Sequence, residues 1–376
     1  MRKNLFVRSI AAVSGIVMLA SLAACGDNTS SAGNNSGSTS TEKITGSFSG
    51  AGATSQQAAE EAWISAYMAA NSGANVTYNP TGSGAGVTTF LSGAAAWAGS
   101  DKALSDDEVT QSSDKACANG TTAFDVPVYI SPIAIIFNLK GVSDAGKHIS
   151  LDADTAAKIF DGKIVKWNDP AIANQNKDLT LPDTQITVVH RSDKSGTTQN
   201  FVSYFKDQAP DSWTHELSEN WPDIPGQQSA KGTSGVVTAV KQADGTIGYA
   251  DFSQVGDLGT AAIKVGENYN EISADAGSKV IEDSEIDTSV KGDNRVVVKI
   301  NHATEAKGAY PIVLVSYDIA CPAYKDASTA KFVKSWLTYV TSDEGQKTAS
   351  SAAGSAPLPS NIVKKVTKSI EAIKTK

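Results

Sequence analysis

The sequence predicts an α/β fold in which most strands pair in parallel. Short apolar runs alternate with segments whose apolar residues recur at helical spacing, over nearly the whole chain after residue 45. Several of the turns that lead from a strand into a helix consist of glycine, serine and threonine, as in α/β proteins that bind a ligand at the carboxyl ends of their strands. With 376 residues, 40% of them hydrophobic and 19% charged, the chain is long enough for two such domains.

Elements of the first 140 residues follow from this pattern. Apolar residues at helical spacing predict a helix over 54–70, capped by Thr54 or Ser55 and ended by Asn71-Ser72-Gly73. A strand is expected at 76–78, followed by a Gly-Ser turn into a helix ending near residue 91. The next strand, 97–100, places Asp101 at its end. The apolar stretch 126–137 predicts a strand, a crossover and a second strand.

The rest of the chain continues the alternation. We expect strands at 186–190, 247–250 and 311–317, and helices at 197–205, 235–242 and 330–339. The polar and charged stretch 266–300 has a weak pattern and receives no assignment.

The first residues read as a targeting segment. Arg2, Lys3 and Arg8 precede an apolar run at 10–20 that is too short to span a bilayer, as in a signal peptide. The following Leu22-Ala23-Ala24-Cys25 resembles the lipobox of bacterial lipoproteins, which implies cleavage after residue 24 and acylation of Cys25. The alternative is a plain secretory signal. Residues 25–44 would then be the lipidated cysteine and a flexible linker, because they are rich in Gly, Ser, Asn and Thr.

Two further cysteines, Cys117 and Cys321, remain after this cleavage. Exported proteins fold in an oxidising compartment, so the pair predicts one disulfide. Two unpaired buried thiols are the alternative.

Composition and motifs argue against several functions. The formal net charge is −8 and no Lys/Arg-rich run occurs, so no nucleic-acid partner is expected. The four histidines are scattered without metal-binding spacing, and neither a Walker A motif nor a dinucleotide fingerprint is present, so we expect no metal, no cofactor and no enzyme. A Ser195–His190–Asp193 triad is also disfavoured, because the G-x-S-x-G motif is missing.

The segment HRSDKSGTTQNF, at 190–201, has the features of an anion site. A strand ends at His190, and Ser195, Gly196 and Thr197 open a helix whose first N–H groups have no partner within the helix. Arg191 can add a charge-assisted bond, and Asp193 can hold its guanidinium in position. A serine-capped helix beside a surface ion pair is the alternative.

Two more small-residue turns strengthen this interpretation. Gly50-Ala51-Gly52-Ala53-Thr54-Ser55 and Thr81-Gly82-Ser83-Gly84-Ala85-Gly86 each lead into a predicted helix. Asp101 is a carboxylate where an anion would bind, and it is tolerated only if the ligand brings a proton to donate. Phosphate keeps a proton near neutral pH and sulfate does not, so Asp101 would reject sulfate through an unpaired buried charge.

The chain resembles the phosphate-binding lipoproteins of bacterial phosphate ABC importers, the PstS family. The resemblance lies in four motifs that occur in this order: GAGAT, GSGAGV, GSDKALSD and RSDKSGT. KIFDGKIVKWNDPAI (158–172) and GTIGYADF (245–252) are similar to that family as well. The resemblance implies a periplasmic-binding-protein fold of two α/β lobes with phosphate in the cleft between them. It implies that one residue, Asp101, is the acceptor and that the donors are Thr54, Ser55, Ser83, Arg191, Ser195, Gly196 and Thr197. Ser55 is a departure, since family members often have Phe there.

The resulting hypothesis is a lipid-anchored monomer on the extracytoplasmic face of the bacterial cell membrane that passes inorganic phosphate to the membrane permease of an ABC importer. We expect lobe I at 45–130 plus 310–376 and lobe II at 131–309, with hinge strands near residues 129–130 and 309–310. A receptor for sulfate or molybdate is the alternative, and a phosphate-ester hydrolase is a more distant one.

Overall fold

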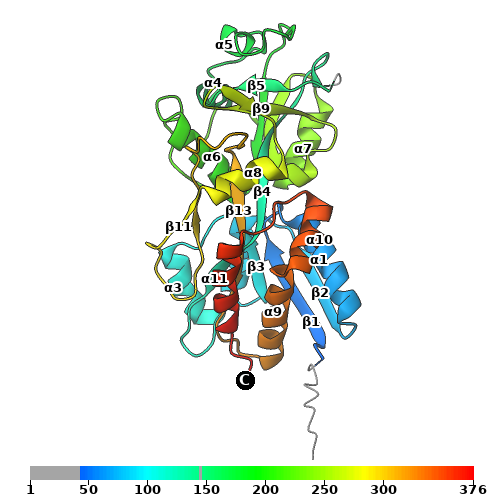
Figure 1. Cartoon of the computed structure of the whole chain (residues 1–376), viewed down its shortest axis with the longest axis vertical. Coiled ribbons are helices and arrows are strands. Elements are labelled where there is room, and N and C mark those ends of the chain that lie inside the picture. Colours follow the sequence, from blue (N-terminus) through cyan, green and yellow to red (C-terminus); the bar gives the residue numbers. More distant parts are fainter. Residues whose placement is uncertain (1–42, 144–145) are drawn as a thin grey trace, which may run out of the picture. The chain divides into compact units, whose positions relative to one another are not determined.

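One long strand, β4 (Phe124–Asn138), belongs to both halves of a curved mixed sheet (Figure 1). The computed structural model describes residues 43–143 and 146–376, and within them the sheet has 11 strands. From Phe124 to Pro132, β4 pairs with β13 (Val313–Ala320), and from Ile133 to Asn138 it pairs with β8 (Thr246–Asp251). We call the strands on the β13 side sheet half 1 and those on the β8 side sheet half 2.

Sheet half 1 has the order β2-β1-β3-β13-β4. Its other strands are β1 (Gly46–Gly52), β2 (Ala74–Asn79) and β3 (Trp97–Ser100). Six of the described helices pack around it: α1 (Gln57–Ala70), α2 (Ser83–Leu91), α3 (Asp106–Lys115), α9 (Ala327–Val340), α10 (Asp343–Ala353) and α11 (Ser360–Glu371). The aromatic side chains of Trp63, Tyr67, Trp97, Phe332 and Trp336 fill the core between the sheet and these helices.

Sheet half 2 continues from β4 through β8 and β6 (Thr187–Arg191) to β7 (Gln228–Ala230). On a branch, β9 (Gly259–Val265) pairs with β4, β5 (Ile149–Leu151) and β10 (Asn268–Asn270). The helices of this part are α4 (Ala153–Phe160), α5 (Pro170–Ala173), α6 (Gly196–Gln208), α7 (Gly232–Gln242), α8 (Ala274–Glu282) and the 3-10 turn η2 (Phe252–Gln254).

The expected α/β class is confirmed, but two local expectations are wrong. β4 is a single strand where a strand, a crossover and another strand were expected. Nearly all of its residues are buried, and Pro127 and Pro132 lie within it without ending it. Pairing is parallel among β1, β2 and β3 and among β6, β7 and β8, yet β4 and β13 run antiparallel to their neighbours.

Helix α1 begins at Gln57 rather than at residue 54. Its N-cap, Gln56, makes no side-chain capping bond, so neither Thr54 nor Ser55 caps this helix. The turn 53–56 is an extra stretch between β1 and α1 whose side chains are nearly all buried. Those side chains are consequently available for other contacts, which are described below.

The segment that sequence patterns left unassigned crosses from one part of the fold to the other. After α8 come β11 (Glu285–Ile286) and β12 (Val298–Lys299), which pair with each other. Arg295 then forms a two-pronged ion pair with Asp125 of β4, with both N–O distances 2.8 Å, and donates to the backbone oxygen of Leu104. Both charged side chains are buried, so this pair fastens the segment to sheet half 1.

A disulfide joins Cys117 to Cys321, with an S–S distance of 2.07 Å. The two cysteines follow α3 and β13 and belong to one small core with Val87, Phe90 and Ile319. Both lie on the side of sheet half 1, so the bond does not connect the two sheet halves. The proposed signal and lipidation site, Cys25 included, lie outside the described residues. In the part of the chain that the structure covers, no helix is both long and apolar enough to cross a bilayer.

Two fully buried carboxyl groups, Asp251 and Asp318, face no cation. Burial raises the pKa of Asp318 on β13 to about 8, and burial raises the pKa of Asp251 at the end of β8 to about 7. Both groups are protonated in the folded protein at pH values where they are ionised in the unfolded chain. The folded state then binds more protons than the unfolded state.

We therefore predict that the free energy of unfolding falls as pH rises from about 4 to about 8. Each group lowers it by at most about 1.4 kcal/mol per pH unit between its unfolded and folded pKa. Denaturant unfolding without added anions, measured at a series of pH values, should give a shallower slope for Asp318→Asn than for the wild type. The exposed Asp107→Asn is the control. An unchanged slope in Asp318→Asn would show that this carboxyl group is ionised in the folded protein.

Candidate anion-binding site

Asp101 lies at the end of β3, is 2% exposed, and accepts hydrogen bonds from three hydroxyl groups. Ser55 and Ser316 donate to its Oδ1 at 2.6 Å each, and Thr197 donates to its Oδ2 at 2.7 Å. An ionised carboxylate can accept about four hydrogen bonds and donate none. The three donors therefore fill three of these positions and leave Oδ2 able to accept one more.

These three donors come from different parts of the fold. Ser55 lies in the turn between β1 and α1, Ser316 lies on β13, and Thr197 lies in the first turn of α6 beyond sheet half 2. Asn200 of α6 also donates to the backbone oxygen of Asp101 at 2.6 Å. Asp101 thus connects α6 with sheet half 1.

Close approach of α6 to Asp101 requires Gly196. A Cβ atom at this position would lie 2.9 Å from the Asp101 backbone carbon and 2.9 Å from Ser83 Oγ, which is too close for any side chain. Gly196 is the first residue of α6, so its small size brings the free N–H groups of this helix up to Asp101 and Ser83.

Three helices begin near one another here: α2 and α6 contact Asp101 directly, and α7 joins them through Asp193 and Thr54. Serines at the starts of α2 and α6 retain a proton to donate. Ser83, the first residue of α2, accepts from the backbone N–H of Asp101 at 3.2 Å. Ser195 caps α6 by accepting from Thr198 N at 3.2 Å. Each hydroxyl accepts a bond here and still has its own O–H available for a ligand. The third helix, α7, begins at Gly232.

Arg191 supplies the positive charge of the site. Its guanidinium donates through Nε and Nη2 to Asp193, at 2.7 and 2.5 Å, and its side chain is 2% exposed. Burial alone would raise the pKa of Asp193, but the hydrogen bonds and charge of Arg191 keep that pKa below its ordinary value. Asp193 also accepts from Gly232 N at 2.9 Å, which ties Arg191 to the start of α7.

Thr54 makes contacts that the sequence did not indicate. Its hydroxyl lies 2.9 Å from the hydroxyl of Thr233 and accepts from Thr233 N at 3.1 Å, while Gln254 donates to its backbone oxygen at 2.8 Å. Helix α7 was expected to begin at residue 235, so Gly232 and Thr233 were missed. The available signal was the sequence Gly-Thr-Ser-Gly at 232–235, which is another small-residue turn into a helix.

The Ser195 hydroxyl and the His190 imidazole, which a catalytic pair would join, each have another partner. His190 Nδ1 pairs with the backbone oxygen of Arg191 at 2.9 Å, and its ring stacks on Trp221 at a centroid distance of 5.5 Å. Burial lowers the pKa of His190. Over residues 43–143 and 146–376, no group of three His, Cys, Asp or Glu side chains could hold a metal ion.

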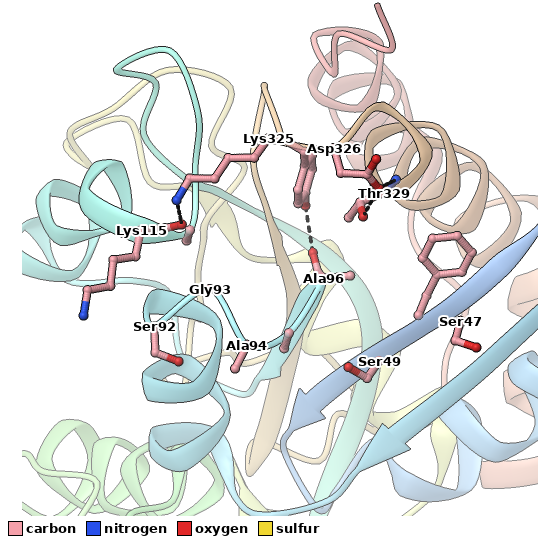
Figure 2. Close-up of a pocket in the computed structure, with 14 residues that line it drawn as sticks. Ser47, Ser49, Ser92, Gly93, Ala94, Ala96, Lys115, Lys325, Asp326 and Thr329 are labelled. Carbon is pink, nitrogen blue, oxygen red and sulfur yellow. Dashed lines mark hydrogen bonds between the residues drawn. The ribbon is translucent and has the colours of Figure 1, made fainter.

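Figure 2 shows a surface cavity, about 460 Å³ in volume, that Asp101 does not line. Its lining includes Ser47, Ser49, Ala96, Lys115 and Lys325. Lys325 donates to the backbone oxygen of Lys115, and Tyr324 donates to that of Ala96, so the polar groups at its rim are largely engaged with one another. None of the residues expected to bind an anion lines this cavity. We therefore place the candidate site at Asp101, where buried donors converge.

Comparisons with solved structures agree with the observed architecture. A periplasmic phosphate-binding protein named PfluDING, solved with phosphate, superposes with a TM-score of 0.69 at 22% identity, over 86% of this chain and 93% of that one. A phosphate-binding protein from Stenotrophomonas maltophilia has a TM-score of 0.67 at 20% identity, with the same coverage. At this level of identity these matches establish the fold.

Sequence relatives establish the family. A family model described as a PBP superfamily domain matches residues 37–344. The phosphate-binding protein PstS2 of Mycobacterium bovis is 36% identical over 98% of this chain and 99% of its own length. PstS of Xylella fastidiosa is 32% identical over 85% of this chain and 83% of its own. The chain therefore belongs to the PstS family of phosphate-binding proteins, within the PBP superfamily.

Proposed function

We propose that this protein binds inorganic phosphate outside the cytoplasm and delivers it to the membrane permease of an ABC importer. The observation that carries the proposal is Asp101, an acceptor-only carboxylate held by three hydroxyls where the N-termini of α2 and α6 meet. Family membership supports it, since the relatives are named phosphate-binding proteins.

Chemical selectivity follows from the opposite hydrogen-bonding roles of Asp101 and its surroundings. Helix N-termini, Arg191, Ser83 and Ser195 offer donors to any oxyanion. The free acceptor position on Asp101 Oδ2 requires a proton from the ligand. Phosphate has one at neutral pH, whereas sulfate would meet the carboxylate with a lone pair. The buried repulsion costs several kcal/mol, which favours phosphate over sulfate or molybdate.

The direction in which each hydroxyl donates determines how its residue would contact phosphate. Ser55 and Thr197 donate their protons to Asp101, so their contribution to phosphate would be the backbone N–H. Ser83, Ser195 and Arg191 retain donors for phosphate. We include Thr54, Gly196 and the supporting Asp193 in the same set, because they lie in the same turns and contact the same helix ends.

Capture would be a hinge closure between lobe I, 45–130 plus 310–376, and lobe II, 131–309. β4 changes partners between Pro132 and Ile133, close to the expected boundary, while Arg295 fastens part of lobe II to lobe I. Direct bonds between the lobes, such as those of Thr197 with Asp101 and of Thr54 with Thr233, would stabilise the closed state. We propose further that the protein is a monomer held at the membrane by lipid on Cys25.

Titration calorimetry on residues 26–376, stripped of phosphate, tests the proposal directly. We expect tight one-to-one binding when phosphate is injected, and the same affinity when excess sulfate is already present. Absence of binding heat together with an unchanged melting temperature in phosphate would contradict the proposed function. Loss of the signal in sulfate would indicate a receptor for a different oxyanion.

Asp101→Asn should remove the discrimination against sulfate. The asparagine amide can still accept from Ser55 and Ser316 through its oxygen, and it presents an N–H where the carboxylate accepted a bond. Competition calorimetry should then show that sulfate displaces phosphate from the variant. Asp107→Asn, an exposed change on α3, should behave as the wild type. Continued exclusion of sulfate by Asp101→Asn would show that this carboxylate does not face the ligand.

Arg191→Ala should weaken phosphate binding by about 2–4 kcal/mol, because a buried charge-assisted bond is lost and Asp193 is left without its cation. Calorimetry measures the loss, and circular dichroism checks that the fold is retained. Lys241→Ala, which removes an exposed charge on α7, is the matched control. Equal affinities for Arg191→Ala and Lys241→Ala would remove Arg191 from the site.

A further inference from the structure

Gln56 is a fully buried amide whose side chain contacts Ser316, a donor to Asp101. It is the last residue before α1 and directly follows Ser55. Its Nε2 donates to Ser316 Oγ at 2.7 Å and to the backbone oxygen of Tyr317 at 3.3 Å. Ser316 in turn donates to Asp101 Oδ1 at 2.6 Å. These bonds form a chain from the start of α1 through β13 to Asp101.

The direction of this chain is fixed by the chemistry of its members. The carbonyl of Tyr317 can only accept, so the NH₂ end of the Gln56 amide must face β13. Ser316 Oγ then accepts from Gln56, and its single proton is free to point at Asp101. A reversed amide would place Oε1 against Ser316 and draw the serine proton away from Asp101.

We propose that Gln56 is a positioning residue for phosphate selectivity: it orients the Ser316 hydroxyl so that this group always donates to Asp101. The inference rests on the proposed function, in which Asp101 accepts the proton of phosphate. With Ser316 and Ser55 both donating to Oδ1, the carboxylate cannot rotate freely, and Oδ2 is presented to the ligand.

The surroundings of Gln56 keep this orientation without adding negative charge. Glu60 and Asp318 lie behind it, fully buried and without a cation, and burial raises the pKa of each well above its ordinary value. In the described residues, Gln56 Oε1 and both carboxyl oxygens of Asp318 have no hydrogen-bond partner of good geometry, although the Gln56 amide lies close enough to Asp318 to oppose part of the rise in its pKa. A protonated Asp318 is neutral, so it does not repel the anion beyond Asp101.

The test is a double-mutant cycle on Gln56→Met and Ser316→Ala, with phosphate affinity measured by calorimetry. Methionine keeps the length of Gln56 and removes its polar atoms. Gln57→Met is the control at the next position, the first residue of α1, where the partly exposed Gln57 donates to Glu61. We expect each single variant to bind phosphate about tenfold more weakly. The double variant should be no weaker than Ser316→Ala, because Gln56 acts through Ser316.

Two outcomes would overturn the inference. One is a Gln56→Met affinity equal to that of Gln57→Met, and the other is a double variant whose loss equals the product of the two single losses. Ser316→Thr keeps the hydroxyl and should bind more tightly than Ser316→Ala; the reverse order would also contradict the role of this group. If Gln56→Met fails to fold, the Ser316 variants still test the hydroxyl through which Gln56 acts. A Ser316→Ala affinity equal to that of the wild type would overturn the inference.

The same titrations separate this inference from the proposed function. A wild-type protein that binds no phosphate would overturn both. A wild type that binds tightly while Gln56→Met binds equally well would overturn only the role of Gln56.

Discussion

The hydrogen bonds to Asp101 are the constraint on which the rest of the site depends. A buried carboxylate without a cation is unfavourable unless several donors stabilise it. Here the donors are hydroxyls from the β1–α1 turn, from β13 and from α6. Each of these elements must therefore reach Asp101 closely. That requirement accounts for Gly196, for the turn that delays α1 until Gln57, and for the buried position of Ser316 in the middle of a sheet.

Contacts at short range also allow an acidic protein to bind an anion. Its net charge is −8, and the site contains one arginine that is already paired with Asp193. Net charge acts over distances that salt screens, whereas backbone N–H groups at helix starts act at contact distance in a buried environment. The small residues of the turns before α2, α6 and α7 let these N–H groups come close. Binding then depends on geometry at contact range rather than on attraction at long range, so the protein would gain little from electrostatic steering.

The sequence predicted site residues best where a local motif contains the groups that would contact the anion. The turns at 50–55, 81–86 and 190–197 were recognisable because glycine and hydroxyl residues before a helix have a direct physical meaning, and the structure brings their side chains together around Asp101. Hydrogen-bond partners that depend on pairing between distant strands were not predicted from the sequence. Ser316 reaches Asp101 because β13 runs antiparallel beside β3, and no pattern near residue 316 announces this. Thr233 was missed because α7 begins earlier than its apolar spacing indicates. The long β4 was misjudged because an apolar run that contains Pro127 and Pro132 does not reveal whether the chain turns or where its strand partners change.

The orientation of the hydroxyls explains why a proton on the ligand matters more at this site than the charge of the ligand. Ser55, Ser316 and Thr197 are hydroxyls that could serve either as donors or as acceptors. Because each gives its proton to Asp101, the carboxylate is fixed as an acceptor, and the remaining lone pair on Oδ2 can be satisfied only by a donor on the ligand. Tyr317 fixes the amide of Gln56, and Gln56 fixes Ser316, so one backbone carbonyl of β13 determines hydrogen-bond polarity several bonds away. In the proposed function, the backbone of the sheet would thereby set the discrimination between two oxyanions of similar size.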